Sequence, residues 1–189
     1  MTTLRRTIRR AETDEKITQG VLAIIRREGL SAVTIDSVVA ETGVAKTTLY
    51  RRYADRTELL CGVATSLTPP PERTYPHTAP GLHDFIDDIR TIFDEQVGLA
   101  AVGAIMAGPG TDVETWREGL VAPLIAQLRT YLEEGVDKQV FHAAHNLELV
   151  IDLVIGGLFI ADTRHRGVPA GWTADMAGLL WRNLTRAPA

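Results

Sequence analysis

Hydrophobic residues recur along most of the chain at intervals of three and four residues, which is the spacing of one face of an α-helix. Near the N-terminus, Ile17, Val21 and Ile24 follow this spacing, and Gly29 ends an amphipathic helix predicted over residues 13–29. No stretch alternates apolar and polar residues between hairpin turns, so the pattern predicts no strand. The sequence therefore predicts an all-α protein of about nine helices.

The same period returns in the second half of the chain. Apolar helical faces run through residues 82–97, 116–132, 147–159 and 172–184. The segment 67–81 ahead of them contains five of the nine prolines, which breaks any regular element. We therefore predict an N-terminal domain over residues 1–66, a proline-rich connector over 67–81 and a C-terminal helical domain over 82–189.

Two short helices are predicted within the N-terminal domain. Thr34 is a good N-cap for the first, and Gly43 closes that helix after about two turns. A second short element covers residues 45–53, and Asp55 begins a further helix. Gly43 suits the turn because glycine tolerates a positive φ. Two short helices joined by such a turn form a helix-turn-helix, whose second helix enters the major groove of DNA.

The second of these helices carries side chains whose chemistry suits DNA. Val44 and Leu49 are apolar anchors that would fix it to the first helix. The other side chains can contact thymine methyls, guanine edges or phosphates, and they are Lys46, Thr47, Thr48, Tyr50, Arg51 and Arg52. An ordinary solvated helix is the alternative. A helix this short is unstable alone, however, and this one follows a capped helix and a glycine turn, which favours DNA binding.

The net charge of −4 hides an asymmetry along the chain. Residues 1–60 carry a charge of +3 and the remainder carries −7. A basic end on an acidic protein is typical of a chain that meets a polyanion at that end. The first eleven residues form a basic arm that is either frayed and solvated or in contact with the DNA backbone or minor groove, and its arginines are Arg5, Arg6, Arg9 and Arg10.

The stretch TIDSVVAETGVAKTTLYRRYADRTELL, residues 34–60, resembles the DNA-binding signature of the TetR/AcrR family of transcriptional regulators. The resemblance implies that Thr34 and Tyr50 contact phosphates and that Thr47 and Thr48 meet bases. It also implies a phosphate contact for Arg56, at the start of the fourth helix. Ala45, Thr47 and the pair Arg51–Arg52 depart from the family's usual residues, which leaves the base preference open.

In that family the C-terminal helices form a ligand pocket and a two-fold dimer interface, so the resemblance implies both here. The expected apolar pocket lining is Phe85, Ile89, Phe93, Met106, Trp116, Leu120 and Leu124, with Arg90, Gln96 or His145 as orienting polar groups. The expected dimer interface on the last two helices is Val150, Val154, Gly157, Leu158, Leu180, Trp181 and Leu184. Each set can equally be internal core, and the sequence does not separate these readings.

Other functional classes find little support. The sequence lacks GxSxG, Walker-type, HExxH and strand-linked GxGxxG motifs, so we predict no enzyme, no catalytic residue and no cofactor. His142 and His145 have helical spacing, but no carboxylate or thiol is arranged with them, so we predict no metal site. Cys61 is the single cysteine, and no apolar run could span a membrane. A cytoplasmic location is therefore predicted, without a membrane partner.

The sequence thus predicts a homodimeric, one-component transcriptional regulator. Its partners would be double-stranded DNA with a palindromic operator, a second copy of itself and a small apolar effector that releases a repressor from DNA. The alternative is a degenerate dimeric accessory protein that keeps this fold and lacks DNA binding or ligand sensing. The polar helix after Gly43 argues against that alternative.

Overall fold

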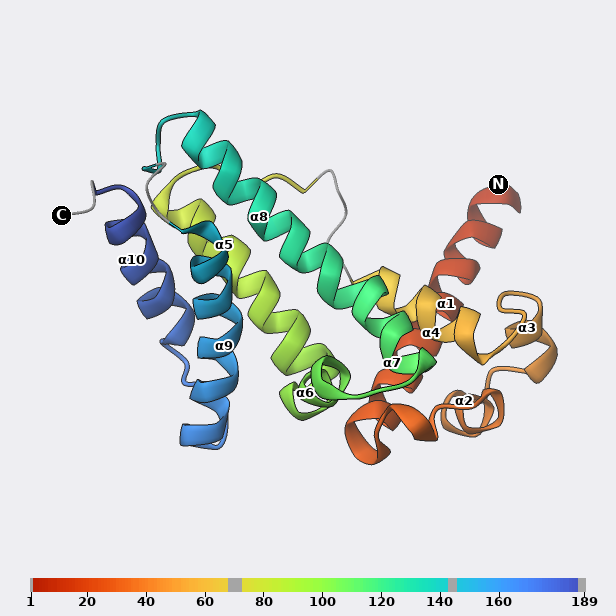
Figure 1. Cartoon of the computed structure of the whole chain (residues 1–189). Coiled ribbons are helices and arrows are strands. Elements are labelled where there is room, and N and C mark those ends of the chain that lie inside the picture. The colour runs from red at the N-terminus through yellow and green to blue at the C-terminus, as the bar shows by residue number, and fades with distance from the viewer. Residues whose placement is uncertain (1, 68–72, 143–145, 187–189) are drawn as a thin grey trace. The chain divides into compact units, whose positions relative to one another are not determined.

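A computed structural model describes residues 2–67, 73–142 and 146–186, with side chains from residue 10 onward. Within these ranges the regular elements are helices and there is no strand, so the predicted all-α class is confirmed (Figure 1). The described residues form two compact units. The first contains residues 2–67 and 100–120, and the second contains 73–99, 121–142 and 146–186. Residues 100–120, which we expected in the C-terminal domain, therefore cluster with the first unit.

The first helix, α1 (Thr2–Glu28), is longer than the sequence pattern predicted. Its buried face holds Ile17, Val21, Ile24 and Ile25, as expected. The segment expected as an N-terminal arm continues this helix. No glycine or proline interrupts residues 2–19, and Arg10 pairs with Asp14 one turn later at 3.9 Å, which supports helix continuation.

The next elements of the first unit have nearly the predicted bounds. A 3-10 turn, η1 (Leu30–Ala32), precedes α2 (Ile35–Thr42), α3 (Lys46–Tyr50) and α4 (Arg56–Leu67). Thr34 caps α2 and Gly43 ends it with φ 66°, in the left-handed region. The Asp55 carboxylate accepts a hydrogen bond from the Glu58 amide at 2.8 Å, which caps α4 as predicted. Gly20 allows α2 to lie close to α1, because a Cβ there would be 2.2 Å from the Thr42 methyl.

Two further helices belong wholly or largely to the first unit. They are α6 (Leu99–Ala107) and α7 (Thr111–Trp116), and α7 packs against α4. A π-helical segment, η3 (Arg117–Val121), follows α7. Gly119 lies against α4, since a Cβ on this residue would be 3.0 Å from the Ala64 methyl. The helix-turn-helix region is therefore held partly by residues distant in sequence.

The second unit is a bundle of four long helices. They are α5 (Ala79–Arg90), which continues as the π-helical η2 (Thr91–Val97), α8 (Ala122–Asp137), α9 (Leu147–His165) and α10 (Trp172–Leu184). Helix α10 packs on α5, and α8 packs on α9. The described part of the predicted connector is irregular over residues 73–78, and α5 begins earlier than expected because Thr78 caps it. In the part of the chain that the structure describes, no helix has the length and apolar character needed to cross a membrane.

Candidate nucleic-acid interface

Helix α3 presents its polar side chains to solvent from an apolar base. Leu49 is fully buried and Val44, in the turn before α3, is 9% exposed, so these residues anchor the helix as predicted. On the opposite side Thr47 and Arg51 are exposed, and Tyr50 keeps 50% of its surface exposed. The turn brings these groups to one surface without a second element covering them in the described chain.

The turn itself is stabilised by hydrogen bonds. The Gly43 amide donates to the Val39 carbonyl at 2.8 Å, and the Val44 amide donates to the Thr42 hydroxyl at 3.1 Å. The buried Thr42 hydroxyl in turn donates to the Val38 carbonyl at 2.6 Å. Because these bonds satisfy the polar groups of the turn, the orientation of α3 relative to α2 is well specified.

Thr34 begins α2 with a reciprocal capping box. Its hydroxyl accepts a hydrogen bond from the Ser37 amide at 3.0 Å, and the Ser37 hydroxyl accepts one from the Thr34 amide at 2.8 Å. Thr34 is exposed, and its hydroxyl proton can still be donated to a phosphate oxygen. The expected phosphate contact at Thr34 is therefore compatible with its structural role.

Lys46 is held by a carboxylate of the preceding helix. Its Nζ lies 2.6 Å from Asp36 Oδ1, and this hydrogen bond raises the pKa of the lysine. The same Nζ lies 6.0 Å from the centre of the Tyr50 ring. Lys46 is exposed and keeps its charge, but DNA phosphates would have to compete with Asp36 for it.

Arg52 corrects the sequence-based expectation. Its side chain is 11% exposed, and its Nε lies 3.1 Å from Asp14 Oδ1 on α1. Its Nη2 donates to the Arg10 carbonyl at 3.3 Å. Tyr53 also packs inward, because a Cβ at Gly62 would lie 2.8 Å from its ring, and burial raises its pKa. Arg52 therefore joins α3 to α1, while its neighbour Arg51 remains exposed.

Arg56 is also committed within the protein. Its Nη2 donates to the Leu30 carbonyl at 2.8 Å and its Nε donates to the Val33 carbonyl. Its Nη1 forms an ion pair with Asp112 on α7. Three directions of the guanidinium fork are thus used, so we withdraw the expectation that Arg56 binds phosphate.

Sequence reasoning missed the three acidic partners, Asp14, Asp36 and Asp112. Asp36 lies in the first turn of α2, where the helix-turn-helix geometry could have indicated a neighbour for Lys46. Asp14 and Asp112 meet their arginines through tertiary packing, and no local pattern marks them. Fewer basic groups are therefore exposed beside α3 than the sequence implied, because Arg52 and Arg56 are engaged within the protein.

Comparison with known proteins agrees with this geometry. Residues 17–62, which contain α2, α3 and their turn, match the family model for bacterial regulatory proteins of the tetR family. This match assigns the DNA-binding region of the chain, residues 17–62, to the TetR family.

Similarity to known proteins extends over most of the chain. It is 23% identical to "Uncharacterized HTH-type transcriptional regulator YdeS" of Bacillus subtilis (strain 168) over 156 residues, 78% of this chain and 76% of the relative. The hemolysin II regulator HlyIIR has the same fold, with a TM-score of 0.62, 16% identity and coverage of 94% of this chain and 99% of that one. FadR from Bacillus subtilis, solved with stearoyl-CoA, has a TM-score of 0.62 and 12% identity, with coverage of 93% of this chain and 99% of that one. The predicted family and fold are confirmed, and these relatives are transcriptional regulators.

The pocket residues expected of a TetR-family protein lie mostly in packed core. Six of the seven are 0–1% exposed, namely Phe85, Ile89, Phe93, Trp116, Leu120 and Leu124. Met106 is instead 40% exposed on α6, and Arg90 is engaged by Asp87 and Glu95. Of the seven, Phe85 lines a cleft that the structure describes within the second unit. His145 lies outside the described residues.

The residues expected at a dimer interface are likewise mostly internal. Five are 0–8% exposed within their own unit, namely Val150, Val154, Leu158, Leu180 and Leu184. Gly157 and Trp181 are half-buried, and a Cβ at Gly157 would lie 2.7 Å from the Met176 methyl. The large apolar side chains exposed on α9 and α10 are Leu149, Leu153, Ile160 and Leu179. The expected residues therefore lie mainly on buried faces of α9 and α10, and the exposed apolar side chains lie on a different face.

Proposed function

We propose that this TetR-family chain is a homodimeric, one-component repressor that binds a palindromic operator and is released by a small molecule. The proposal rests mainly on the way α3 exposes its polar side to solvent. Its apolar side is anchored by Leu49, and its exposed side offers Thr47, Tyr50 and Arg51 beside a defined turn. Such a surface suits the major groove, where hydroxyls, methyl groups and guanidinium groups can read base edges.

The proposed DNA contacts divide into two classes. Thr47, half-buried Thr48 and Arg51 would face bases or the adjoining backbone from α3. Thr34, at the start of α2, and Tyr50 would donate hydroxyl hydrogen bonds to phosphates, which position the protein on the duplex. Lys46 would exchange part of its contact with Asp36 for a phosphate. Arg52 and Arg56 support the surface from behind and are not included.

The exposed apolar face of α9 and α10 supports a homodimer. Leu149, Leu153, Gly156 and Ile160 follow one another on α9 at intervals of four, three and four residues, which places them along one side of the helix. A Cβ at Gly156 would meet nothing within 4 Å, so the helix backbone is accessible there. Two copies of α9 and α10 would form a four-helix interface that covers this surface. A dimer would also present two recognition helices to a palindrome.

Release by an effector would act as a population shift between a DNA-binding form and a second form. The relative FadR was solved with stearoyl-CoA, which supports small-molecule binding as a hypothesis for this chain too. Within the first unit, Arg56 connects α7 to the carbonyls of Leu30 and Val33, just ahead of α2. A displacement of α7 would therefore be transmitted to the start of the helix-turn-helix. Such a protein would act in the cytoplasm, where it can meet chromosomal DNA.

Selection of bound sequences from random double-stranded DNA tests this function directly. We expect enrichment of a palindrome, and we expect Thr47→Ala and Arg51→Ala to weaken binding to it. Arg26→Ala is the matched control, because Arg26 is exposed on α1 and its loss makes the same charge change as loss of Arg51. Failure of the purified dimer to enrich any sequence would favour the degenerate accessory protein.

A further inference from the structure

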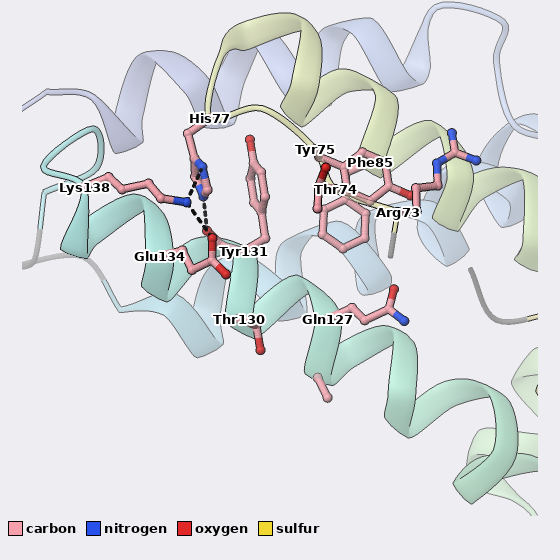
Figure 2. Close-up of a pocket in the computed structure, with 11 residues that line it drawn as sticks. Arg73, Thr74, Tyr75, His77, Phe85, Gln127, Thr130, Tyr131, Glu134 and Lys138 are labelled. Carbon is pink, nitrogen blue, oxygen red and sulfur yellow. Dashed lines mark hydrogen bonds and ion pairs between the residues drawn. The ribbon is translucent and has the colours of Figure 1, made fainter. Parts of the chain in front are cut away.

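The second unit contains an open cleft of about 390 Å³ between the loop 73–78 and helix α8. Figure 2 shows the loop lying above α8, with α5 behind. The lining residues are Arg73, Thr74, Tyr75, His77, Phe85, Ala126, Gln127, Thr130, Tyr131, Glu134 and Lys138. This volume suits a small organic molecule. The cleft is distinct from the buried residues that the sequence predicted as a pocket, apart from Phe85.

The loop that forms one side of the cleft is firmly attached to the bundle. The Tyr75 ring stacks on Phe85 with ring centres 4.3 Å apart and planes within 2°, and its hydroxyl donates to Asp88. The Tyr131 hydroxyl donates to the Pro76 carbonyl at 3.1 Å. Gly81 makes room for this course of the loop, because a Cβ there would lie 1.9 Å from the Pro76 oxygen. The cleft is therefore a built feature of the unit.

The inner wall consists of flat aromatic rings. The His77 ring stacks on Tyr131 at 4.5 Å with planes within 7°, and His77 Nε2 donates to the Tyr131 carbonyl at 2.9 Å. Phe85 meets Tyr131 edge to face at 5.4 Å. Burial raises the pKa of Tyr131 to about 12, so its ring carries no charge near neutral pH. Tyr131 is 6% exposed and His77 covers one of its faces, so this wall offers mainly ring edges to a planar ligand.

The opposite wall remains open because its residues are small. Ala126 and Thr130 lie one turn apart on α8, and both are exposed. Gln127 and Glu134 add polar groups beside them. A large side chain at Ala126 would occupy the cleft without disturbing the buried face of α8, where Leu124 and Leu128 are fully buried.

Cationic side chains stand at the two ends of the cleft. Figure 2 shows Lys138 at one end and Arg73 at the other. Arg73 is 50% exposed and lies 2.8 Å from Asp88, while Lys138 is 55% exposed and lies 2.6 Å from Glu134. The cations among the lining residues outnumber the one lining carboxylate, Glu134. The guanidinium of Arg73 also has the planar fork that binds oxyanions in two-pronged fashion.

We propose that this cleft binds a flat aromatic anion, with its rings against Tyr75 and Tyr131 and its acidic group on Arg73. The role of this cleft as the effector site rests on the proposed regulatory function. Its ability to bind a ligand does not depend on that function. Contacts with these rings would supply the apolar contact area. Arg73, whose guanidinium lies 5.3 Å from the centre of the Tyr75 ring, would exchange Asp88 for the anionic group of the ligand.

A matched pair of fluorescent probes tests the proposal on the full-length protein. The anion is 8-anilino-1-naphthalenesulfonate, and its neutral counterpart N-phenyl-1-naphthylamine has the same rings without the sulfonate. We expect one sulfonate probe per chain, bound about ten-fold more tightly than the neutral probe. Ala126→Phe should weaken binding of the sulfonate probe about ten-fold by filling the cleft. Arg73→Gln should abolish the preference for the anion while leaving the neutral probe unaffected.

Ala122→Phe is the control for the filled cleft. Ala122 is exposed on α8 one turn before Ala126 and does not line the cleft, so this variant should bind the probe normally. Circular dichroism and the melting temperature establish that each variant is folded. Equal binding by wild type and Ala126→Phe would overturn the proposal, because the probe would then lie elsewhere, for example on the exposed face of α9 and α10. Equal affinity for the two probes would overturn the assignment to an anion.

The DNA readout separates this inference from the proposed function. Saturation with the sulfonate probe should lower operator affinity of the wild type about five-fold, and that of Ala126→Phe much less. Probe binding that depends on Ala126 in a protein without operator affinity would support the cleft and contradict the regulatory function. If the protein binds the operator but the probe binds wild type and Ala126→Phe equally, the regulatory function is supported and the cleft proposal is contradicted.

Discussion

Helix α3 and the outer face of α9 and α10 expose opposite kinds of side chain. On α3, polar groups such as Thr47 and Arg51 face solvent above the buried Leu49. On α9, the exposed side chains include Leu153 and Ile160, at 46% and 58%. Polar groups lose little by remaining in water, whereas a contiguous apolar face is stabilised by a partner. The difference fits the proposed roles, a reversible DNA contact for α3 and a lasting dimer contact for α9 and α10.

The largest expected effect comes from placing a charge on the apolar face. Leu153→Glu should convert the dimer to a monomer, because a carboxylate buried at the interface would lose its hydration. Because Leu153 is half-exposed in the single chain, the substitution should leave the fold of each chain intact. Operator affinity should fall about a hundred-fold or more, since two linked recognition helices bind far better than one. Sedimentation velocity and DNA titration measure the two effects.

Met106→Glu is the control for that substitution. Met106 is 40% exposed on α6, in the first unit, so the same kind of change should leave the oligomeric state unaltered. A Leu153→Glu protein that still sediments as a dimer would show that the interface lies on another face.

The neighbouring arginines Arg51 and Arg52 should give contrasting results. Arg51→Ala should weaken operator binding about ten-fold and reduce its salt dependence by about one phosphate contact, with stability unchanged. Arg52→Ala should instead lower the free energy of unfolding by about 1 kcal/mol, because it removes the ion pair with Asp14 and the hydrogen bond to the Arg10 carbonyl. Urea unfolding and DNA titrations across salt concentrations distinguish them. Equal losses of DNA affinity without destabilisation would mean that Arg52 leaves α1 to contact DNA.

A smaller effect is expected where α7 meets the helix-turn-helix. Asp112→Asn removes the ion pair with Arg56 but leaves the guanidinium bonds to Leu30 and Val33. We expect a loss of about 0.5–1 kcal/mol in unfolding free energy, because both side chains are partly exposed and solvent screens the pair. The response of operator affinity to effector should also weaken. Glu114→Gln also removes a carboxylate from α7 and so controls for the change in net charge. An unchanged effector response in Asp112→Asn would exclude transmission through the ion pair of Arg56 with Asp112.

The contrast between the two regions also explains what the sequence could predict. The bounds of α2, the caps at Thr34 and Asp55 and the turn at Gly43 follow from residues adjacent in the chain, and all were predicted. The roles of Arg52 and Arg56 depend on Asp14 and Asp112, which tertiary packing brings near, so local chemistry misassigned them. On α9 the sequence is apolar on more than one side. Which side faces inward depends on its packing against α8 and α10, so periodicity alone could not show that Val150 and Val154 are buried whereas Leu149 and Leu153 are exposed.

The smallest expected effect concerns the alkaline titration of Tyr131. Burial raises its pKa from 10.0 in the unfolded chain to about 12, so folding favours the neutral phenol. The resulting stabilisation is complete below pH 10 and is lost as pH rises through 12. Tyr131→Phe keeps the ring but not the hydroxyl bond to Pro76, which should cost about 1 kcal/mol at neutral pH. The difference between wild type and this variant in unfolding free energy should therefore shrink from pH 10 to 12. A difference that stays constant over that range would mean that water reaches the hydroxyl, and that the wall of the cleft beside the loop 73–78 is looser than its stacked rings indicate.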